Sequence, residues 1–520
     1  MGAVQAAIAA PHAVARAPRG LPAVVCVAGA SSLAIEICAS RLLAPYFGNS
    51  TVVWANVIGL ILIYLSVGYW LGGRTADRHP TPRALGVVLL LAAAAISVLP
   101  FVAQPFLSLA VRGLNALSGG VVVGSFFSTL LLFAVPVSLL GMVSPFALRL
   151  ALRDVSRAGR TSGRLSSLAT VGAIAGTFGA ALLLIPAIGT QRTMLAASLA
   201  TALAALPLLL RPAVLLAVVV GGLLAVPPAS PKPEVGTIAE REDAYQFVQV
   251  LREADGKIVM RTDEGVADQS VYRASTALTG GEWDMPLVVP PLMSAAPRHV
   301  LVIGNAGGTT ARALAAEYPG AAIDGVELDP VVSQLARQYM AMGSIPGLTV
   351  HDGDGRAFLS ATHMRYDLIV VDAYRQTYIP FQLATEEFFA QVREHLTPGG
   401  AVALNVERVP DDDSLVRTVA GTVANVFPQV WVWPALRFNE LVVGLAKPIA
   451  QNSIGARLAS LPPDVQTLAP LVTETAHVVA PSSSPMTDDH APVEWLTDRA
   501  VLAYIASGGR LDEQLLPTAP

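Results

Sequence analysis

Three acidic residues stand at the ends of apolar runs, where a carboxylate could take part in chemistry. Glu327 ends one such run, Asp354 follows the run at 348–350, and Asp372 ends the run at 366–371. In an open α/β sheet, ligands bind beyond the carboxyl ends of the strands. A carboxylate at such a place can accept hydrogen bonds from ribose hydroxyls or act as a general base.

A glycine-rich turn precedes the first of these acids. The apolar run 299–303 opens into Gly304-Asn305-Ala306-Gly307-Gly308, and Glu327 follows about twenty residues later. A strand, a glycine turn, a helix and a second strand that ends in an acid are typical of a nucleotide-binding half-fold.

Each of these groups also has a structural interpretation that needs no ligand. The glycines could form a tight turn between a strand and a helix and nothing more. Glu327 could cap a helix or lie at the surface, and Asp372 could be a turn residue. Asp354 could cap the helix that begins near Arg356. The sequence predicts a ligand site and leaves these alternatives open.

The elements that must position these residues follow from the apolar patterns. Residues 245–251 and 258–260 are predicted strands, and Asp255-Gly256 between them is a hairpin signal. Strands then alternate with helices, including a helix from about Thr385 to His395 and a strand over 401–405. We therefore expect a small β-rich lead-in and a doubly wound parallel sheet of the α/β Rossmann-like type.

The first part of the chain has the composition of an α-helical polytopic membrane domain. Of 520 residues, 53% are hydrophobic and 14% are charged, and charged residues are sparse before Lys232. Crossing a bilayer takes about twenty apolar residues. Apolar segments occur at 22–44, 52–72, 84–104, 120–141, 167–187, 190–210 and 212–226, of which the last is short. Gly172, Gly176 and Gly179 predict a small-residue face for close helix contact.

The arginines bear on the orientation of these segments. They gather before the first segment and after the second and fourth, as Arg16, Arg19, Arg74, Arg78, Arg83, Arg149, Arg153, Arg157, Arg160 and Arg164. The positive-inside bias places this side in the cytoplasm, so seven crossings would put the C-terminal half outside. Cofactor supply favours the cytoplasm for that half. We expect the cytoplasmic placement in a multi-pass cell-membrane protein, with segment 212–226 lying at the interface or re-entering.

Two cysteines and one charged pair lie on the first segment. Cys26 and Cys38 are too far apart along one helix to form a disulfide. Glu36 and Arg41 are either a functional pair or a structural contact, with Arg41 reaching the interface.

The predicted organisation has six parts. They are an N-terminal tail (1–21), a transmembrane domain of six or seven helices (22–226), a Pro-rich linker (227–240), a small β-rich domain (241–295), a Rossmann-like transferase core (296–450) and a C-terminal segment (451–520).

The segment from Tyr245 to about Leu404 resembles the spermidine synthase family of aminopropyltransferases, in its bacterial membrane-fused form. The matching features are Tyr245-Gln246, Gln269-Ser270, the glycine turn at 304–308, the motif 326–330, Gly353-Asp354-Gly355, and Val371-Asp372 followed by 383–388. The resemblance implies a Rossmann-like core of the S-adenosylmethionine-dependent transferase type. It also implies transfer of an aminopropyl group from decarboxylated S-adenosylmethionine to an amine acceptor, which leaves methylthioadenosine.

The resemblance also assigns roles to residues. It places Gln246, Gly304, Gly308, Glu327, Asp354 and Gly355 at the nucleoside, Asp372 as the base that deprotonates the attacking amine, and Gln269, Asp284, Tyr374 and Arg375 at the substrate. It implies no metal.

Several positions on the amine side depart from the family pattern. Gly307 stands where the family usually has an aspartate that binds the aminopropyl ammonium, and Arg375 stands where it has a second aspartate. Trp283-Asp284 replaces a Tyr-His pair. Asp488 and Asp489 in the tail either fold over the pocket and supply carboxylates, or belong to a solvated turn with Asp489 near a helix start.

Three functions remain open at this point. Aminopropyl transfer is the function that the resemblance implies. Methyl transfer from S-adenosylmethionine to a small or membrane-borne acceptor is the first alternative, which the loss of the acid at Gly307 favours. A nucleoside sensor or transporter without turnover is the second. Expected partners are a small-molecule amine or other nucleophile, the lipid bilayer and a possible second copy in a homodimer. The net charge of −4 gives no indication of a nucleic-acid partner.

Overall fold

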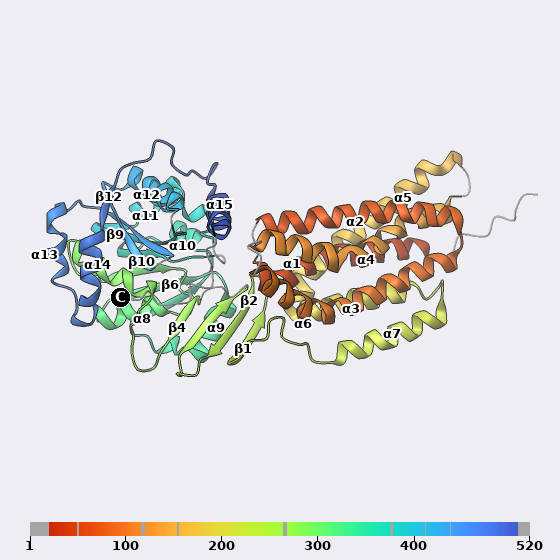
Figure 1. The fold of residues 1–520 in the computed structure, drawn as a ribbon, viewed down its shortest axis with the longest axis horizontal. Coiled ribbons are helices and arrows are strands. Elements are labelled where there is room, and N and C mark those ends of the chain that lie inside the picture. The colour runs from red at the N-terminus through yellow and green to blue at the C-terminus, as the bar shows by residue number, and fades with distance from the viewer. Residues whose placement is uncertain are drawn as a thin grey trace, which may run out of the picture.

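A computed structural model describes residues 20–48, 51–115, 120–152, 155–263, 268–374, 378–410, 412–436 and 438–507. The described chain is elongated, with a bundle of long helices at one end and an α/β unit at the other (Figure 1).

Seven helices make up the described part of the bundle. They are α1 (Leu21–Phe47), α2 (Thr51–Arg78), α3 (Pro82–Asn115), α4 (Gly120–Ala151), α5 (Ala158–Phe178), α6 (Ile185–Ala204) and α7 (Leu210–Ala225). A π-helical turn, η2 (Gly179–Leu184), joins α5 to α6, and the chain leaves helical geometry at Gly189, with φ 80° and ψ 166°. Five elements are long and apolar enough to cross a membrane when α5, η2 and α6 are counted as one, whereas α7 is a shorter apolar helix.

Successive helices of the bundle alternate in direction. The C-terminal end of α1 and the N-terminal ends of α2 and α6 contact the α/β unit, whereas Arg149 of α4 pairs with Asp77 of α2 at 3.0 Å at the opposite end. Helix α7 packs along α6 and α3 and returns toward the α/β unit. Its C-terminal end therefore lies beside the first turns of α6, where Arg192 donates to the Val226 carbonyl. Segment 212–226 thus lies lengthwise in the bundle as α7, and its expected interfacial or re-entrant placement in a membrane stays a prediction.

Close contact between α1 and α5 depends on two of the three predicted glycines. A Cβ atom at Gly172 would lie 1.9 Å from the Cys26 carbonyl oxygen, and one at Gly176 would lie 2.1 Å from that of Ala30. A Cβ at Gly179 would meet nothing within 4 Å. The prediction of a small-residue face is confirmed for the first two glycines and wrong for Gly179.

The β-rich lead-in is a four-stranded antiparallel sheet. Its strands are β1 (Thr237–Glu242), β2 (Phe247–Arg252), β3 (Ile258–Thr262) and β4 (Ser270–Tyr272), in the order β1-β2-β3-β4. Gly256, with φ 85°, lies in the turn between β2 and β3, so the predicted hairpin is confirmed.

The second sheet has eight described strands in the order β12-β10-β11-β9-β8-β5-β6-β7. They are β5 (His299–Ile303), β6 (Ala322–Glu327), β7 (Leu348–Asp352), β8 (Tyr366–Val371), β9 (Leu396–Glu407), β10 (Gln429–Leu436), β11 (Asn439–Leu445) and β12 (His477–Val479). Strands β5 to β9 pair in parallel, whereas β10, β11 and β12 extend the sheet in antiparallel fashion. The Rossmann-like prediction is confirmed, with an antiparallel edge that the patterns did not predict.

Helices cover both faces of this sheet. They are α8 (Thr309–Glu317), α9 (Pro330–Tyr339), α10 (Gly355–Ala361), α11 (Glu386–Glu394), α12 (Ser414–Val426), α13 (Ile454–Leu458), α14 (Ala469–Thr475) and α15 (Val493–Ala506), with the 3-10 helix η3 (Glu282–Val288) before β5. Val300 and Val302 of β5 pack into one core and Leu301 and Ile303 into the other, as the alternation of a strand requires. The helix predicted from Thr385 to His395 is confirmed as α11.

Candidate active site

The candidate site lies where the order of the strands changes direction, between β5 and β8. Ligands bind at such a switch point because the chain leaves the two neighbouring strands toward opposite faces. Gly304 follows β5 with φ 87°, and a Cβ atom there would lie 2.3 Å from the Asp372 carbonyl oxygen. Only glycine fits this approach, so the glycine turn and the end of β8 are in contact.

Glu327, at the end of β6, holds the glycine turn. Its carboxylate accepts hydrogen bonds from the N–H groups of Ala306 at 2.9 Å and Asp329 at 3.0 Å, and the residue is 8% exposed. Burial raises the pKa of Glu327, while these N–H groups act in the opposite direction. The surface interpretation of Glu327 is therefore wrong, and the helix cap of α9 is Asp329, which accepts from Val331 N at 2.8 Å.

Gln246 reaches the same edge from the β-rich sheet. Its side-chain amide donates to Asp329 Oδ2 at 3.0 Å. Burial, followed by the neighbouring Asp243, raises the pKa of Asp329 to about 7. No role was predicted for Asp329 from the sequence, although an acid directly before Pro330 is a recognisable N-cap signal.

Asp354, Gly355 and Gly308 lie at the amino ends of helices. Asp354 accepts from Ala357 N at 2.8 Å, so its capping interpretation is confirmed, and its nucleoside contact stays a prediction. Gly355 packs against β5, since a Cβ atom there would lie 2.4 Å from Ile303 Cγ2. Gly308, with φ 79°, precedes α8.

Asp372 follows β8 and is held by a chain of amides. Asn405 Nδ2 donates to Asp372 Oδ1 at 3.0 Å, and Asn439 Nδ2 donates to Asn405 Oδ1 at 3.0 Å. Burial raises the pKa of Asp372 to about 6, and the Asn405 hydrogen bond opposes this shift. Sequence reasoning missed both asparagines; an amide at the carboxyl end of the neighbouring predicted strand was the available signal.

Further carboxylates surround Asp372. The Tyr374 hydroxyl donates to the Asn405 carbonyl at 2.9 Å, and its pKa is raised by burial and by Glu407, Asp372 and Glu282. Burial, together with the charge of Asp372, raises the pKa of Glu282 to about 8. Neither Glu282 nor Glu407 was predicted from the sequence. Of these groups, Asp372 is ionised at neutral pH, whereas Glu282 becomes ionised only above about pH 8.

The other predicted substrate residues have different surroundings. The Asp284 carboxylate accepts from the N–H groups of Thr279 at 2.9 Å and Gly280 at 2.7 Å, so it holds the turn before η3. Gln269 donates its own N–H to the Met260 carbonyl and precedes Ser270. Arg375 lies outside the described residues. Substrate contact by these three side chains stays a prediction.

Gly307 is closely packed. Its N–H donates to Ser270 Oγ at 2.7 Å, and a Cβ atom at this position would lie 2.7 Å from both Ser270 Cβ and Met340 Sδ. A larger residue therefore has no room in the present arrangement.

The tail segment docks beside α10 and α11. Arg356 donates to both oxygens of Asp488 at 2.7 Å, and Thr385 Oγ1 donates to Asp488 Oδ1 at 2.7 Å. The Arg356 guanidinium lowers the pKa of Asp488. A turn closed by hydrogen bonds between Thr487 and His490 contains Asp489. Asp488 thus has cationic and hydroxyl partners of its own and joins the two helices.

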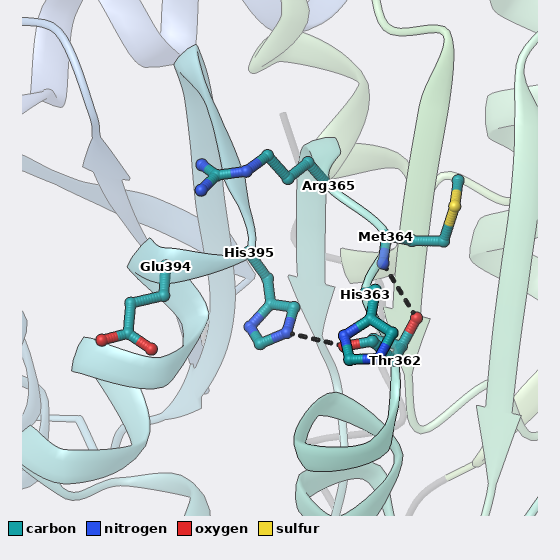
Figure 2. A pocket seen from close by; sticks show the side chains of 6 residues that line it. All are labelled: Thr362, His363, Met364, Arg365, Glu394 and His395. Atoms are coloured by element: carbon teal, nitrogen blue, oxygen red, sulfur yellow. Dashed lines mark hydrogen bonds between the residues drawn. The ribbon is translucent and has the colours of Figure 1, made fainter.

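A separate surface pocket of about 320 Å³ lies at the amino ends of β8 and β9 (Figure 2). Its lining is Thr362, His363, Met364, Arg365, Glu394 and His395. This is the edge of the sheet opposite to Asp372, so the pocket is not part of the candidate site.

Known proteins match this α/β region. The family model described as "Spermine/spermidine synthase domain" matches residues 285–436. A probable polyamine aminopropyl transferase from Bifidobacterium longum is 37% identical over 195 residues, and a polyamine aminopropyltransferase from Vibrio vulnificus is 37% identical over 117 residues. These alignments cover 37% and 22% of this chain.

The alignments with these two relatives cover only part of this chain and only part of each relative. The chain spans 43% of the Bifidobacterium protein and 39% of the Vibrio protein. A probable spermidine synthase structure from Corynebacterium glutamicum gives a TM-score of 0.37 at 19% identity, covering 46% of this chain and 94% of that one. Over residues 285–436, this chain is therefore similar to the spermine/spermidine synthase family.

Proposed function

We propose that this chain is a membrane-anchored aminopropyltransferase that moves an aminopropyl group from decarboxylated S-adenosylmethionine to an amine acceptor. The observation that carries the proposal is Asp372, a carboxylate beside the glycine turn at the switch point, hydrogen-bonded by Asn405. The family of residues 285–436 supports the same chemistry.

The proposed reaction is a displacement in which Asp372 handles the proton. An amine attacks only when it is neutral, so a base must remove its proton before or during attack. The amine lone pair forms the new C–N bond, the electron pair of the breaking C–S bond passes to the sulfonium sulfur, and the proton goes to Asp372. Methylthioadenosine leaves as a neutral thioether and needs no acid. A carboxylate with a pKa of about 6 is ionised at neutral pH and can accept this proton.

The nucleoside half of the proposed site consists of Gln246, Gly304, Gly308, Glu327, Asp354 and Gly355. Glu327 and Asp329 already pair with backbone and amide donors, so they pre-organise the glycine turn against which a nucleoside would lie. The amine half consists of Asp372 with Glu282 and Glu407. The ionised Asp372 favours a cationic acceptor at neutral pH, and Glu282 adds its charge above about pH 8.

One observation favours methyl transfer as a second candidate. Gly307 lacks the acid that would bind the aminopropyl ammonium, and Ser270 and Met340 occupy the space beside it. The carboxylate of intact S-adenosylmethionine would meet no repelling charge from that position.

The test is a product assay on the purified full chain in detergent. The chain is supplied with putrescine and either decarboxylated or intact S-adenosylmethionine, and the nucleoside product is identified. We expect methylthioadenosine from the decarboxylated donor. S-adenosylhomocysteine from the intact donor would establish methyl transfer instead, and donor binding without either product would favour a sensor or transporter.

We further propose that the soluble half faces the cytoplasm, where adenosine-based donors are made, and that the chain is a multi-pass membrane protein. The five apolar elements support membrane anchoring. The domain divisions given above and a homodimer also stay predictions.

A further inference from the structure

One short segment contacts both the helical bundle and the nucleoside half of the site. It runs from the end of β1 at Glu242 through Asp243, Ala244 and Tyr245 to Gln246, the residue before β2. Glu242 and Ala244 form hydrogen bonds with the bundle, and Asp243 and Gln246 belong to the contacts with the site. The segment therefore connects the bundle directly with the α/β unit.

On the bundle side, the contacts involve Glu242 and Ala244. The Glu242 carboxylate accepts from Thr190 N at 3.0 Å and also from the Thr190 hydroxyl. Thr190 presents its N–H because the chain leaves helical geometry at the preceding Gly189, and a Cβ atom at that glycine would lie 3.5 Å from Glu242 Oε2. The Arg41 guanidinium of α1 donates to the Ala244 carbonyl.

On the site side, the contacts involve Asp243 and Gln246. Asp243 Oδ1 accepts from Tyr245 N at 2.8 Å and Gln246 N at 3.0 Å, which sets the shape of the turn. Gln246 Nε2 then donates to Asp329, a residue that is 1% exposed.

Asp329 is linked to the glycine turn through Glu327. Its N–H donates to Glu327 at 3.0 Å, and Glu327 accepts from Ala306 N at 2.9 Å. Hydrogen bonds, joined by the peptide chain of segment 242–246, therefore connect the break in α6 with the loop proposed to hold the nucleoside.

We propose that α1 and α6 position the nucleoside site through segment 242–246, so that Arg41, Thr190 and Glu242 are positioning residues for donor binding. The inference rests on the proposed nucleoside site. It gives the charged residue near the end of α1 a function, and it makes the bundle part of the binding machinery as well as an anchor.

Coupling of this kind is reciprocal. If the bundle contacts favour the binding conformation of the turn, nucleoside binding must stabilise those contacts by the same free energy. The Thr190 N–H, which is hydrogen-bonded to Glu242, should then exchange more slowly with solvent when nucleoside is bound.

The first experiment measures methylthioadenosine affinity calorimetrically on the full chain in detergent. Arg41→Ala and Thr190→Val should each weaken binding by about tenfold, within the usual range of coupling between sites. Arg41→Lys should bind close to the parent, because an ammonium can still reach a carbonyl oxygen. The control Arg149→Ala breaks an ion pair with Asp77 at the far end of the bundle and should leave affinity unchanged.

Turnover distinguishes positioning from general damage. At saturating donor, Arg41→Ala should keep kcat close to that of the parent while the KM for the donor rises, because Asp372 and its amides are untouched. Equal nucleoside affinity in the parent, Arg41→Ala and Thr190→Val would overturn the inference. A parent that binds no nucleoside would overturn the proposed function instead, which is a separate result.

The second experiment needs no variant and covers the case in which Arg41→Ala does not fold. Hydrogen exchange of the peptide that spans 186–194 is followed in the parent with and without methylthioadenosine. We expect slower exchange with ligand for this peptide and no change for peptides at the far ends of α2 and α4. Unchanged exchange at 186–194 under saturating ligand would contradict the coupling.

Discussion

At the residue scale, the chemistry depends on how Asp372 is held. Burial favours the protonated form of its carboxyl, and the hydrogen bond from the Asn405 amide favours the ionised form. Asn439 orients Asn405 in turn, so two uncharged side chains together stabilise the ionised form of the proposed base. Its pKa of about 6 lies far enough above the ordinary aspartate value to make proton transfer favourable and low enough for ionisation at neutral pH.

Asp372→Asn should lower kcat by roughly 10²- to 10⁴-fold, the range typical of a lost general base, while methylthioadenosine affinity stays within twofold of the parent. In the parent, kcat/KM should rise with pH through about 6, because below that pH the carboxyl is protonated and cannot accept a proton. The variant should lack this limb. A variant that turns over at the parent rate would make Asp372 a structural residue.

Above about pH 8, where the Glu282 carboxyl is ionised, Glu282→Gln should raise the KM for a diamine acceptor by about tenfold and change kcat less, since it removes a charge that shares the environment of Asp372. The matched control is Glu394→Gln, an exposed acid at the opposite edge of the sheet (Figure 2). If both variants show the parent KM, the acceptor does not contact Glu282.

At the element scale, the glycine turn is shaped by the strands and helices packed around it. Ser270 of β4 accepts the Gly307 N–H, and Met340 at the end of α9 fills the remaining space. The β-rich sheet thus closes the position where the family usually has an acid. This packing decides what a substitution there does.

Gly307→Asp should therefore damage the turn and not restore an ammonium site. The new Cβ would lie 2.7 Å from Ser270 Cβ, which cannot move away as a flexible side-chain end could. Overpacking of this kind costs typically about 1–3 kcal/mol. We expect a lower melting temperature and weaker binding of methylthioadenosine. The double variant Gly307→Asp with Ser270→Gly is the control, since it relieves one contact; a single variant with parent stability would show that the turn can shift.

At the scale of the whole molecule, the bundle and the α/β unit set the sidedness together. Most arginines of the bundle lie at its end away from the α/β unit, where α2 and α4 end and where α3 and α5 begin. They are the arginines at 74, 78, 83, 149, 157, 160 and 164. Their distribution favours a cytoplasmic position for that end. Donor supply favours the opposite orientation, so sidedness is a sharp test of the proposed function.

A reporter active only in the cytoplasm, fused after Pro520, should give a positive signal if the domain uses a cytosolic donor. The same reporter inserted between α4 and α5 should be silent. Three helices of the bundle, α5, α6 and α7, separate that position from the α/β unit, so the two reporters would lie on opposite sides of the membrane. The reverse pattern would mean that the arginines set the orientation, and turnover with a cytosolic donor would then be impossible for the inserted protein.

The sequence by itself determined the elements and the positions of the main carboxylates. The Rossmann-like unit, the hairpin at Gly256, α11, and the placing of Glu327 and Asp372 at strand ends all follow from local periodicity and turn chemistry, which act over a few residues. Tertiary structure decided which side chains meet. Asn405 reaches Asp372, Ser270 fills the space at Gly307, and Glu242 meets Thr190 because strand order and helix packing join residues far apart in the chain. No local pattern encodes those distances.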